Sequence, residues 1–216
     1  MNIVIAALGG MAGALAGWWL AHHPQVVDPR GEESAWPLPG AIALALTAGV
    51  VAALSLRTGH HDLGPGILSA VFAIALVTLA GTDFKRHVLP NRVTYPLIAA
   101  ALAFAWAWPD RSIVDALVGG AVGVGISIGL IALSLLASGG RNPGAAFGIG
   151  DMKLIVFLGV LLGWPLSIRA LLLGTALGGV AALVALIRSG RGQAIAYGPY
   201  LIAGGLFVLL WPGAFG

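Results

Sequence analysis

The chain consists of long apolar segments separated by short polar loops, and this pattern restricts it to a membrane fold. Clusters of charge, proline and glycine divide it into eight segments: 2–21, 38–56, 64–82, 93–108, 113–137, 152–164, 166–187 and 194–211. A transmembrane helix needs about 20 mostly apolar residues. Only 9% of residues are charged, against about a quarter in a globular chain, so too few polar side chains exist to cover a surface in water. We therefore predict an all-α polytopic membrane helix bundle of about eight transmembrane helices, forming one integral membrane domain over residues 1–216.

Two of these apolar segments, the sixth and the first, allow more than one interpretation. The sixth segment is short, and only Trp164-Pro165 separates it from the seventh, so one long broken helix and seven spans remain an alternative. The first segment lacks a basic start and is long enough to span, which favours a retained helix over a cleaved signal peptide.

Many glycines recur at a spacing of four residues. They are Gly9, Gly13 and Gly17; Gly119 and Gly123; Gly125 and Gly129; Gly174 and Gly178. Such spacing lets helix backbones approach closely in lipid. We expect these glycines to pack helices rather than to bind a ligand.

The basic residues predict the orientation of the frame, because short cytosolic loops are enriched in Lys and Arg. Loops one, three, five and seven hold eight of them: Arg30, Lys85, Arg86, Arg92, Arg141, Lys153, Arg188 and Arg191. The other loops hold Arg57, Arg111 and Arg169. We therefore expect the odd-numbered loops in the cytosol and both termini outside. The net charge of +3 is too small and too scattered for a nucleic-acid surface.

Two aspartates stand at the ends of apolar segments. Asp83 directly follows the run 67–82, and Asp151 directly precedes the run that starts at Met152. Ionisable residues near membrane depth are costly and are therefore functional candidates. In the predicted orientation both lie at the cytosolic boundary, although they are 68 residues apart in sequence. Two nearby carboxylates share a proton, so one acts as base on a water while the other protonates a substrate carbonyl, as in aspartic proteases. The alternative is that each aspartate only caps a helix or pairs with a nearby basic residue.

Three short elements surround or follow these aspartates. The first runs from Asp83 through a basic stretch to Pro90 and Asn91, and the second is Gly148-Ile149-Gly150-Asp151-Met152-Lys153. The third is Tyr197-Gly198-Pro199-Tyr200. A Gly-Pro pair inside an apolar helix frees backbone groups, which is tolerated where they are buried in protein or line a water-filled cavity.

In these three elements the chain resembles the type IV prepilin peptidase family, membrane aspartic proteases that carry a GxGD motif. In that family the first catalytic Asp leads a basic stretch that ends in a hydrophobic residue, Pro and Asn, as in 83–91 here. The second lies in GxGDxK, as in 148–153, and an aromatic-Gly-Pro-aromatic element follows, as in 197–200. GxGD alone would be weak, because glycine makes up 33 of 216 residues. The resemblance covers most of the chain from Ile67 onward.

The resemblance implies an endopeptidase of the bacterial inner membrane. It would remove the short basic leader of pilin-like precursors at the cytosolic face, typically after a glycine, next to the start of their hydrophobic helix. Asp83 and Asp151 would be the catalytic pair and would activate water without metal, cofactor or covalent intermediate. The partners would be the precursor and the bilayer, and the oligomeric state stays open.

The remaining motif residues have supporting roles in this reading. Gly148 and Gly150 would shape the turn before Asp151. Lys153 would tune Asp151 or snorkel to the interface. Pro90 and Asn91 are expected to end their loop and cap the next helix.

One departure from the family concerns zinc. Many bacterial members have a large first cytosolic loop with paired CxxC motifs that hold zinc, and they also N-methylate the new N-terminus. Here that loop spans only about 21–37 and the chain has no cysteine. A zinc site of that type therefore cannot form, N-methyltransferase activity is in doubt, and the chain resembles a reduced form serving a tight-adherence or secretion pilus.

Other residues and functions carry less weight. Two clusters resemble metal ligands, His22 with His23 and His60 with His61 and Asp62, but the orientation places them on opposite faces. Asp110 and Asp115, near Arg111, are expected to mark the outer boundary, and His87 is expected in a solvated loop. The alternative functions are a small proton-coupled transporter, another GxGD protease of the signal-peptide-peptidase type, and a non-enzymatic scaffold.

Overall fold

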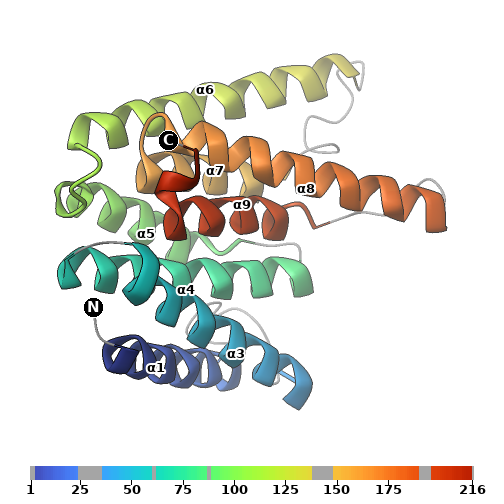
Figure 1. Ribbon diagram of the computed structural model, residues 1–216. Coiled ribbons are helices and arrows are strands. Elements are labelled where there is room, and N and C mark those ends of the chain that lie inside the picture. The colour runs from blue at the N-terminus through green and yellow to red at the C-terminus, as the bar shows by residue number, and fades with distance from the viewer. Residues whose placement is uncertain are drawn as a thin grey trace.

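The computed structural model describes residues 3–23, 36–59, 62–86, 89–137, 148–189 and 196–215, and in these residues the chain is helical without strands. The α-helices are α1 (Ile3–His22), α3 (Leu38–Leu54), α4 (Leu63–Arg86), α5 (Asn91–Ala103), α6 (Ile113–Ala137), α7 (Ile149–Leu162), α8 (Leu166–Ser189) and α9 (Gly198–Leu210). Short helical turns occupy η1 (Ser55–Gly59), η2 (Ala105–Ala107) and η3 (Pro212–Phe215). The predicted all-α bundle is confirmed (Figure 1).

The helices fall into a long and a short class. Five described segments are long and apolar enough to cross a membrane: Ile3–His22, Leu38–Arg57, Leu63–Lys85, Ile113–Leu133 and Leu166–Arg188. Helices α5, α7 and α9 have 13, 14 and 13 residues, so each is about 20 Å long, whereas the hydrocarbon core is about 30 Å thick. The segments expected at 93–108 and 194–211 are therefore shorter helices than predicted, whereas the segment at 152–164, already expected to be short, has about the predicted length. Most side chains of α7 and α9 are buried, which explains why these segments are as apolar as a span.

The sixth and seventh predicted segments are separate helices. Helix α7 ends at Leu162, and Gly163 follows with a φ of +69°, a conformation that favours glycine. The backbone N–H of Trp164 then donates to the carbonyl of Asp115 on α6, at 2.9 Å. Helix α8 starts after Pro165, so the alternative of one broken helix is wrong.

Glycine faces join several helix pairs, as their spacing predicts. A Cβ added at Gly13 of α1 would lie 2.7 Å from the carbonyl oxygen of Ala48 of α3, and one at Gly174 of α8 would lie 2.7 Å from Leu201 Cα of α9. Neither leaves room for a side chain. The pair Gly125 and Gly129 is an exception, because no described residue lies within 4 Å of a Cβ at either position. For that pair the expected packing role is wrong.

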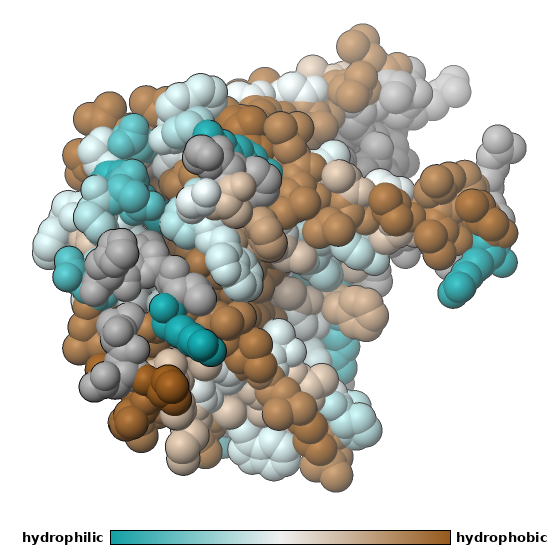
Figure 2. Space-filling view, in the orientation of Figure 1, coloured by the Kyte–Doolittle hydropathy of each residue, from teal (hydrophilic) through white to brown (hydrophobic). Residues whose placement is uncertain are grey.

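The outer surface of the bundle is apolar. Large hydrophobic side chains are exposed on most helices, among them Ile3, Leu15, Leu136, Leu172 and Ile187. Figure 2 shows such side chains over much of one face and along the end of α8, which projects beyond the rest of the bundle. A surface of this kind suits a lipid environment.

Candidate active site

Asp83 lies on α4, one turn before that helix ends. Its side chain is only 5% exposed, and the α4 sequence that precedes it is mostly apolar. The hydroxyl of the neighbouring Thr82 donates to the carbonyl of Leu79, at 2.9 Å. Burying a carboxylate costs free energy, and ionisable residues near membrane depth are functional candidates for that reason. Asp83 therefore remains a functional candidate.

Asp151 lies in the first turn of α7. Its backbone N–H donates to the carbonyl of Gly148 at 3.0 Å, which closes the turn that starts the helix. A carboxylate in this turn is favoured by the helix dipole.

The two motif glycines lie beside the Asp151 carboxylate and the chain leading to α5. Gly148 has an extended backbone with a φ of −70°, which any residue adopts. A Cβ at Gly148 would lie 3.4 Å from Asp151 Oδ2, and one at Gly150 would lie 3.4 Å from the Leu89 side chain. Both distances are ordinary van der Waals contacts, so neither position requires glycine for lack of space.

The two carboxylates meet at Gly198, the first residue of α9. A Cβ built at Gly198 would lie 2.5 Å from Asp83 Oδ2 and 3.5 Å from Asp151 Oδ1. Because both distances are measured from one point, the two oxygens are at most about 6 Å apart. Residues from α4, α7 and α9 thus form one site, which the sequence spacing of Asp83 and Asp151 alone does not reveal.

The element Tyr197-Gly198-Pro199 begins α9 rather than interrupting it. Pro199 lies in the first turn, where its missing N–H is not needed, so the expected break inside a helix is wrong. The ring of Tyr197 packs on Gly178 of α8, where a Cβ would lie 2.5 Å from Cε2. Its hydroxyl donates to the carbonyl of Thr175 at 3.2 Å. Tyr197 therefore fixes the start of α9 against α8 and holds Gly198 beside the aspartates.

Lys153 and Asn91 contact each other across the site. Lys153 Nζ donates to Asn91 Oδ1 and lies 5.5 Å from the centre of the Tyr95 ring. Asn91 is the first residue of α5, and Pro90 holds the N-cap position without a side-chain cap. The predicted capping role of Asn91 is therefore wrong, and its side chain links α5 to α7 instead.

The electrostatics of the site favour a shared proton. Asp151 lies outside the five long apolar segments, and burial, followed by the charge of Asp83, raises its pKa to about 6, while a backbone hydrogen bond with Gly148 opposes the rise. Two carboxyl groups this close do not ionise together easily.

Two neighbouring helices, α6 and α8, extend well beyond the level of the site. Ser127 of α6 donates through its hydroxyl to the carbonyl of Met152, at 3.3 Å, and Gly178 of α8 contacts Tyr197. From these levels α6 and α8 each continue for about ten residues, to Ala137 and Ser189, which corresponds to about 15 Å. Figure 1 shows both helices extending past α9.

Arg111, which was predicted to lie in a loop on the outer side of the membrane, has a structural role. Its side chain is buried, donates through Nη1 to the carbonyl of Leu161 in the last turn of α7, and lies 4.7 Å from the centre of the Trp108 ring. Its Nε lies 3.5 Å from Asp110 Oδ1. A cation suits a helix C-terminus. Nothing in the sequence distinguishes Arg111 from a loop charge.

The remaining polar candidates lie away from the aspartates. The Nδ1 atoms of His22 and His23 are 2.8 and 2.9 Å from carbonyl oxygens one turn earlier in α1. Asp115 accepts from the backbone N–H and the hydroxyl of Ser112, at 2.8 and 2.7 Å, and so caps α6. His60, His61 and His87 lie outside the described residues. Within the described ranges, no three His, Asp or Glu side chains are grouped as a metal site would require.

Comparison with known proteins identifies the family. A sequence model described as the type IV leader peptidase family matches residues 70–183, more than half of the chain, and this stretch contains both aspartates. The chain belongs to this family.

Individual relatives agree with that assignment. A prepilin leader peptidase/N-methyltransferase of Aeromonas salmonicida (strain A449) is 31% identical over 164 residues, which cover 75% of this chain and 54% of the relative. Proteins of the same description are 30% identical in Dickeya chrysanthemi, covering 83% and 62%, and 27% identical in Escherichia coli (strain K12), covering 88% and 81%. The chain spans about half the length of the first of these relatives. No solved structure matches it significantly.

Proposed function

We propose that this chain is an aspartic endopeptidase that removes the basic leader of type IV pilin-like precursors, with Asp83 and Asp151 as the catalytic pair. The observation that carries the proposal is the convergence of both carboxylates on Gly198, in a chain of the type IV leader peptidase family. The relatives' names supply the substrate class.

The proposed reaction uses water as the nucleophile. The pair holds one proton. The ionised carboxylate takes a proton from the water as it attacks the scissile carbonyl, and the protonated carboxyl donates its proton to the carbonyl oxygen. The raised pKa of Asp151 supports Asp151 as the proton donor and Asp83 as the base. Collapse of the tetrahedral intermediate returns a proton to the leaving amine, so no covalent intermediate forms.

The proposed location is the cytosolic side of the bacterial inner membrane. Eight of the eleven basic residues stand in the loops on the predicted cytosolic side, the side on which both aspartates are expected. The proposal concerns leader cleavage alone and does not include N-methylation, because this chain has no cysteine for the zinc-binding loop that many family members carry.

The test is cleavage of a pilin-like precursor in membranes that contain equal amounts of each variant. We expect Asp83→Asn and Asp151→Asn to abolish cleavage, because Asn keeps the shape of the side chain and removes the titrating proton. Asp110→Asn is the matched control, since Asp110 lies on the far side of the bundle near Arg111. Cleavage at the parental rate by either site variant would refute the proposed pair.

A further inference from the structure

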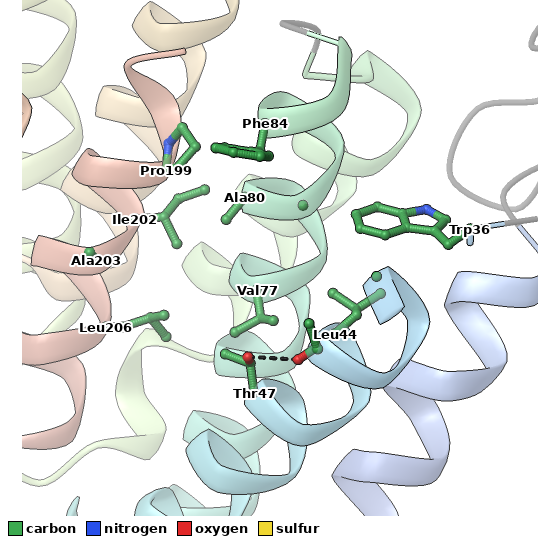
Figure 3. A pocket seen from close by; sticks show the side chains of 13 residues that line it. Trp36, Leu44, Thr47, Val77, Ala80, Phe84, Pro199, Ile202, Ala203 and Leu206 are labelled. Carbon is green, nitrogen blue, oxygen red and sulfur yellow. Dashed lines mark hydrogen bonds between the residues drawn. The ribbon is translucent and has the colours of Figure 1, made fainter. Parts of the chain in front are cut away.

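An apolar groove leads away from the aspartates along three helices. It has a volume of about 420 Å³ and is lined by α3, α4 and α9 (Figure 3). Phe84 and Pro199 form one end of it, and Thr47 and Leu206 lie at the other. Phe84 directly follows Asp83, and Pro199 directly follows Gly198. On α4 and α9 the groove therefore begins one residue away from a residue of the site, although neither aspartate lines it, and Phe84 at this end is 75% exposed.

The lining of the groove follows one face of each helix. On α4 it is formed by Val77, Ala80 and Phe84, whose spacing of three and four residues places them on one stripe. Seven residues of helix correspond to about 10 Å. The lining on α3 and α9 has the same spacing. The groove thus has the length of two helical turns and runs parallel to the bundle.

The chemistry of the groove selects a helical occupant. Its lining is almost entirely apolar, and the hydroxyl of Thr47 is satisfied by the carbonyl of Ala43 in its own helix, at 2.8 Å. An extended peptide would therefore find few partners for its backbone N–H and C=O groups among the described lining residues. An α-helix satisfies those groups internally, which is why it is the form that apolar chains adopt in lipid.

Small residues along the groove allow close approach of another backbone. Ala43 of α3 and Ala203 of α9 belong to its lining and are exposed. Gly40 and Gly81 line the groove as well, but the ring of Trp36, which precedes α3, covers them, since a Cβ at these positions would lie 3.0 and 2.8 Å from that ring. Small residues at such positions are typical of helix–helix contacts within membranes. Helices α3 and α9 both pack against α4 but make few contacts with each other, which leaves the groove open between them.

We propose that this groove binds the apolar helix of the precursor, starting directly after the scissile bond. The inference rests on the proposed function, because the groove begins one residue from Asp83 and from Gly198, so a precursor cut at that site would have its apolar helix beside Phe84 and Pro199. The occupant is thus a transmembrane helix of the substrate, and a lipid acyl chain is the competing outcome of the test.

The first experiment compares two substrates. One is a precursor peptide with a basic leader and an apolar helix of about 20 residues, and the other is the same leader with only a few polar residues after the cut. The groove variants are Ala203→Phe and Ala43→Phe. The control is Ala176→Phe, at an exposed α8 position outside the groove.

We compare kcat/KM for the precursor with kcat/KM for the short substrate. In both groove variants we expect the ratio of these two values to fall about tenfold, or about 1.4 kcal/mol, through a higher KM for the precursor. The control should keep the parental ratio. An unchanged ratio in both groove variants would overturn the proposal. If the parent cleaves neither substrate, the proposed function itself fails, and the groove is then decided by the second experiment.

The second experiment needs no catalysis and uses the absence of cysteine from the chain. Ala203→Cys and, as the control, Ala176→Cys are each combined with Asp83→Asn, and the precursor carries one cysteine two turns into its apolar helix. We expect oxidation in membranes to link the precursor to the Ala203→Cys protein at least about tenfold more than to the control, the factor expected for binding. Equal linking at both positions, or none at Ala203→Cys, would overturn the proposal and leave lipid as the occupant.

Discussion

Gly198→Ala is the substitution that most directly tests the geometry of the site. The added methyl group would lie 2.5 Å from Asp83 Oδ2 and 2.9 Å from its Cγ, whereas ordinary van der Waals contact begins at 3.4 Å. Either the carboxylate or the start of α9 must therefore move by about 0.9 Å. A misplacement of about 1 Å costs an enzyme about 10²-fold in rate, or about 2.7 kcal/mol of transition-state stabilisation. We expect a loss of this size in kcat/KM for precursor cleavage.

Two other glycine substitutions separate this effect from a loss of folding. No residue in the described part of the chain lies within 4 Å of a methyl group added at Gly179 of α8, so Gly179→Ala should cleave at the parental rate. Gly13→Ala of α1 would collide with the carbonyl of Ala48 on α3, in a helix pair that carries neither aspartate. It should lower the thermal unfolding temperature and retain activity per folded molecule. Parental activity of Gly198→Ala at normal protein levels would refute the reasoning.

Three further predictions concern the charged groups. Dicyclohexylcarbodiimide, which reacts with protonated carboxyl groups, should label Asp151 below about pH 6 and progressively less above it, because the raised pKa keeps the carboxyl protonated up to that pH. Asp83→Asn should move the midpoint of labelling to lower pH, and an unchanged midpoint would contradict the coupling of the two carboxyl groups. Lys153→Met should leave that midpoint in place, since the ammonium is held by Asn91, and should lower the free energy of unfolding by about 1 kcal/mol; a shifted midpoint would show that Lys153 tunes the carboxyl. Arg111→Met should lower the free energy of unfolding by about 2 kcal/mol, because a buried carbonyl in the last turn of α7 loses its donor, and an unchanged thermal transition would exclude this role.

The apolar pattern was sufficient to predict the fold class but not the lengths of all helices. The runs at 152–164 and 194–211 are as apolar as a span because protein covers α7 and α9, and hydropathy does not distinguish a protein environment from lipid. Glycine spacing has the same limit. It correctly predicts the contact of Gly13 with α3, yet Gly125 and Gly129 face open space.

The positions of the two aspartates at segment ends were enough to select them as candidates. What the sequence could not supply was the third component, because the approach of Gly198 to both carboxylates depends on how α9 packs on α8 through Tyr197. The contact between Lys153 and Asn91 likewise depends on how two helices pack, so it could not be predicted from the sequence.

Helices α6 and α8 extend past the aspartates, so two distances are distinguished at this site: from the aspartates to the helix ends, and from the aspartates to bulk water. The distance from the site to the helix ends is fixed by the chain, at about ten residues on each helix. The distance from the site to bulk water is set by the lipid that surrounds their exposed apolar side chains, such as Leu136 and Ile187, and therefore varies with acyl-chain length. Under the proposed mechanism each cut consumes one water molecule, so we expect the rate of hydrolysis to depend on the thickness of the bilayer.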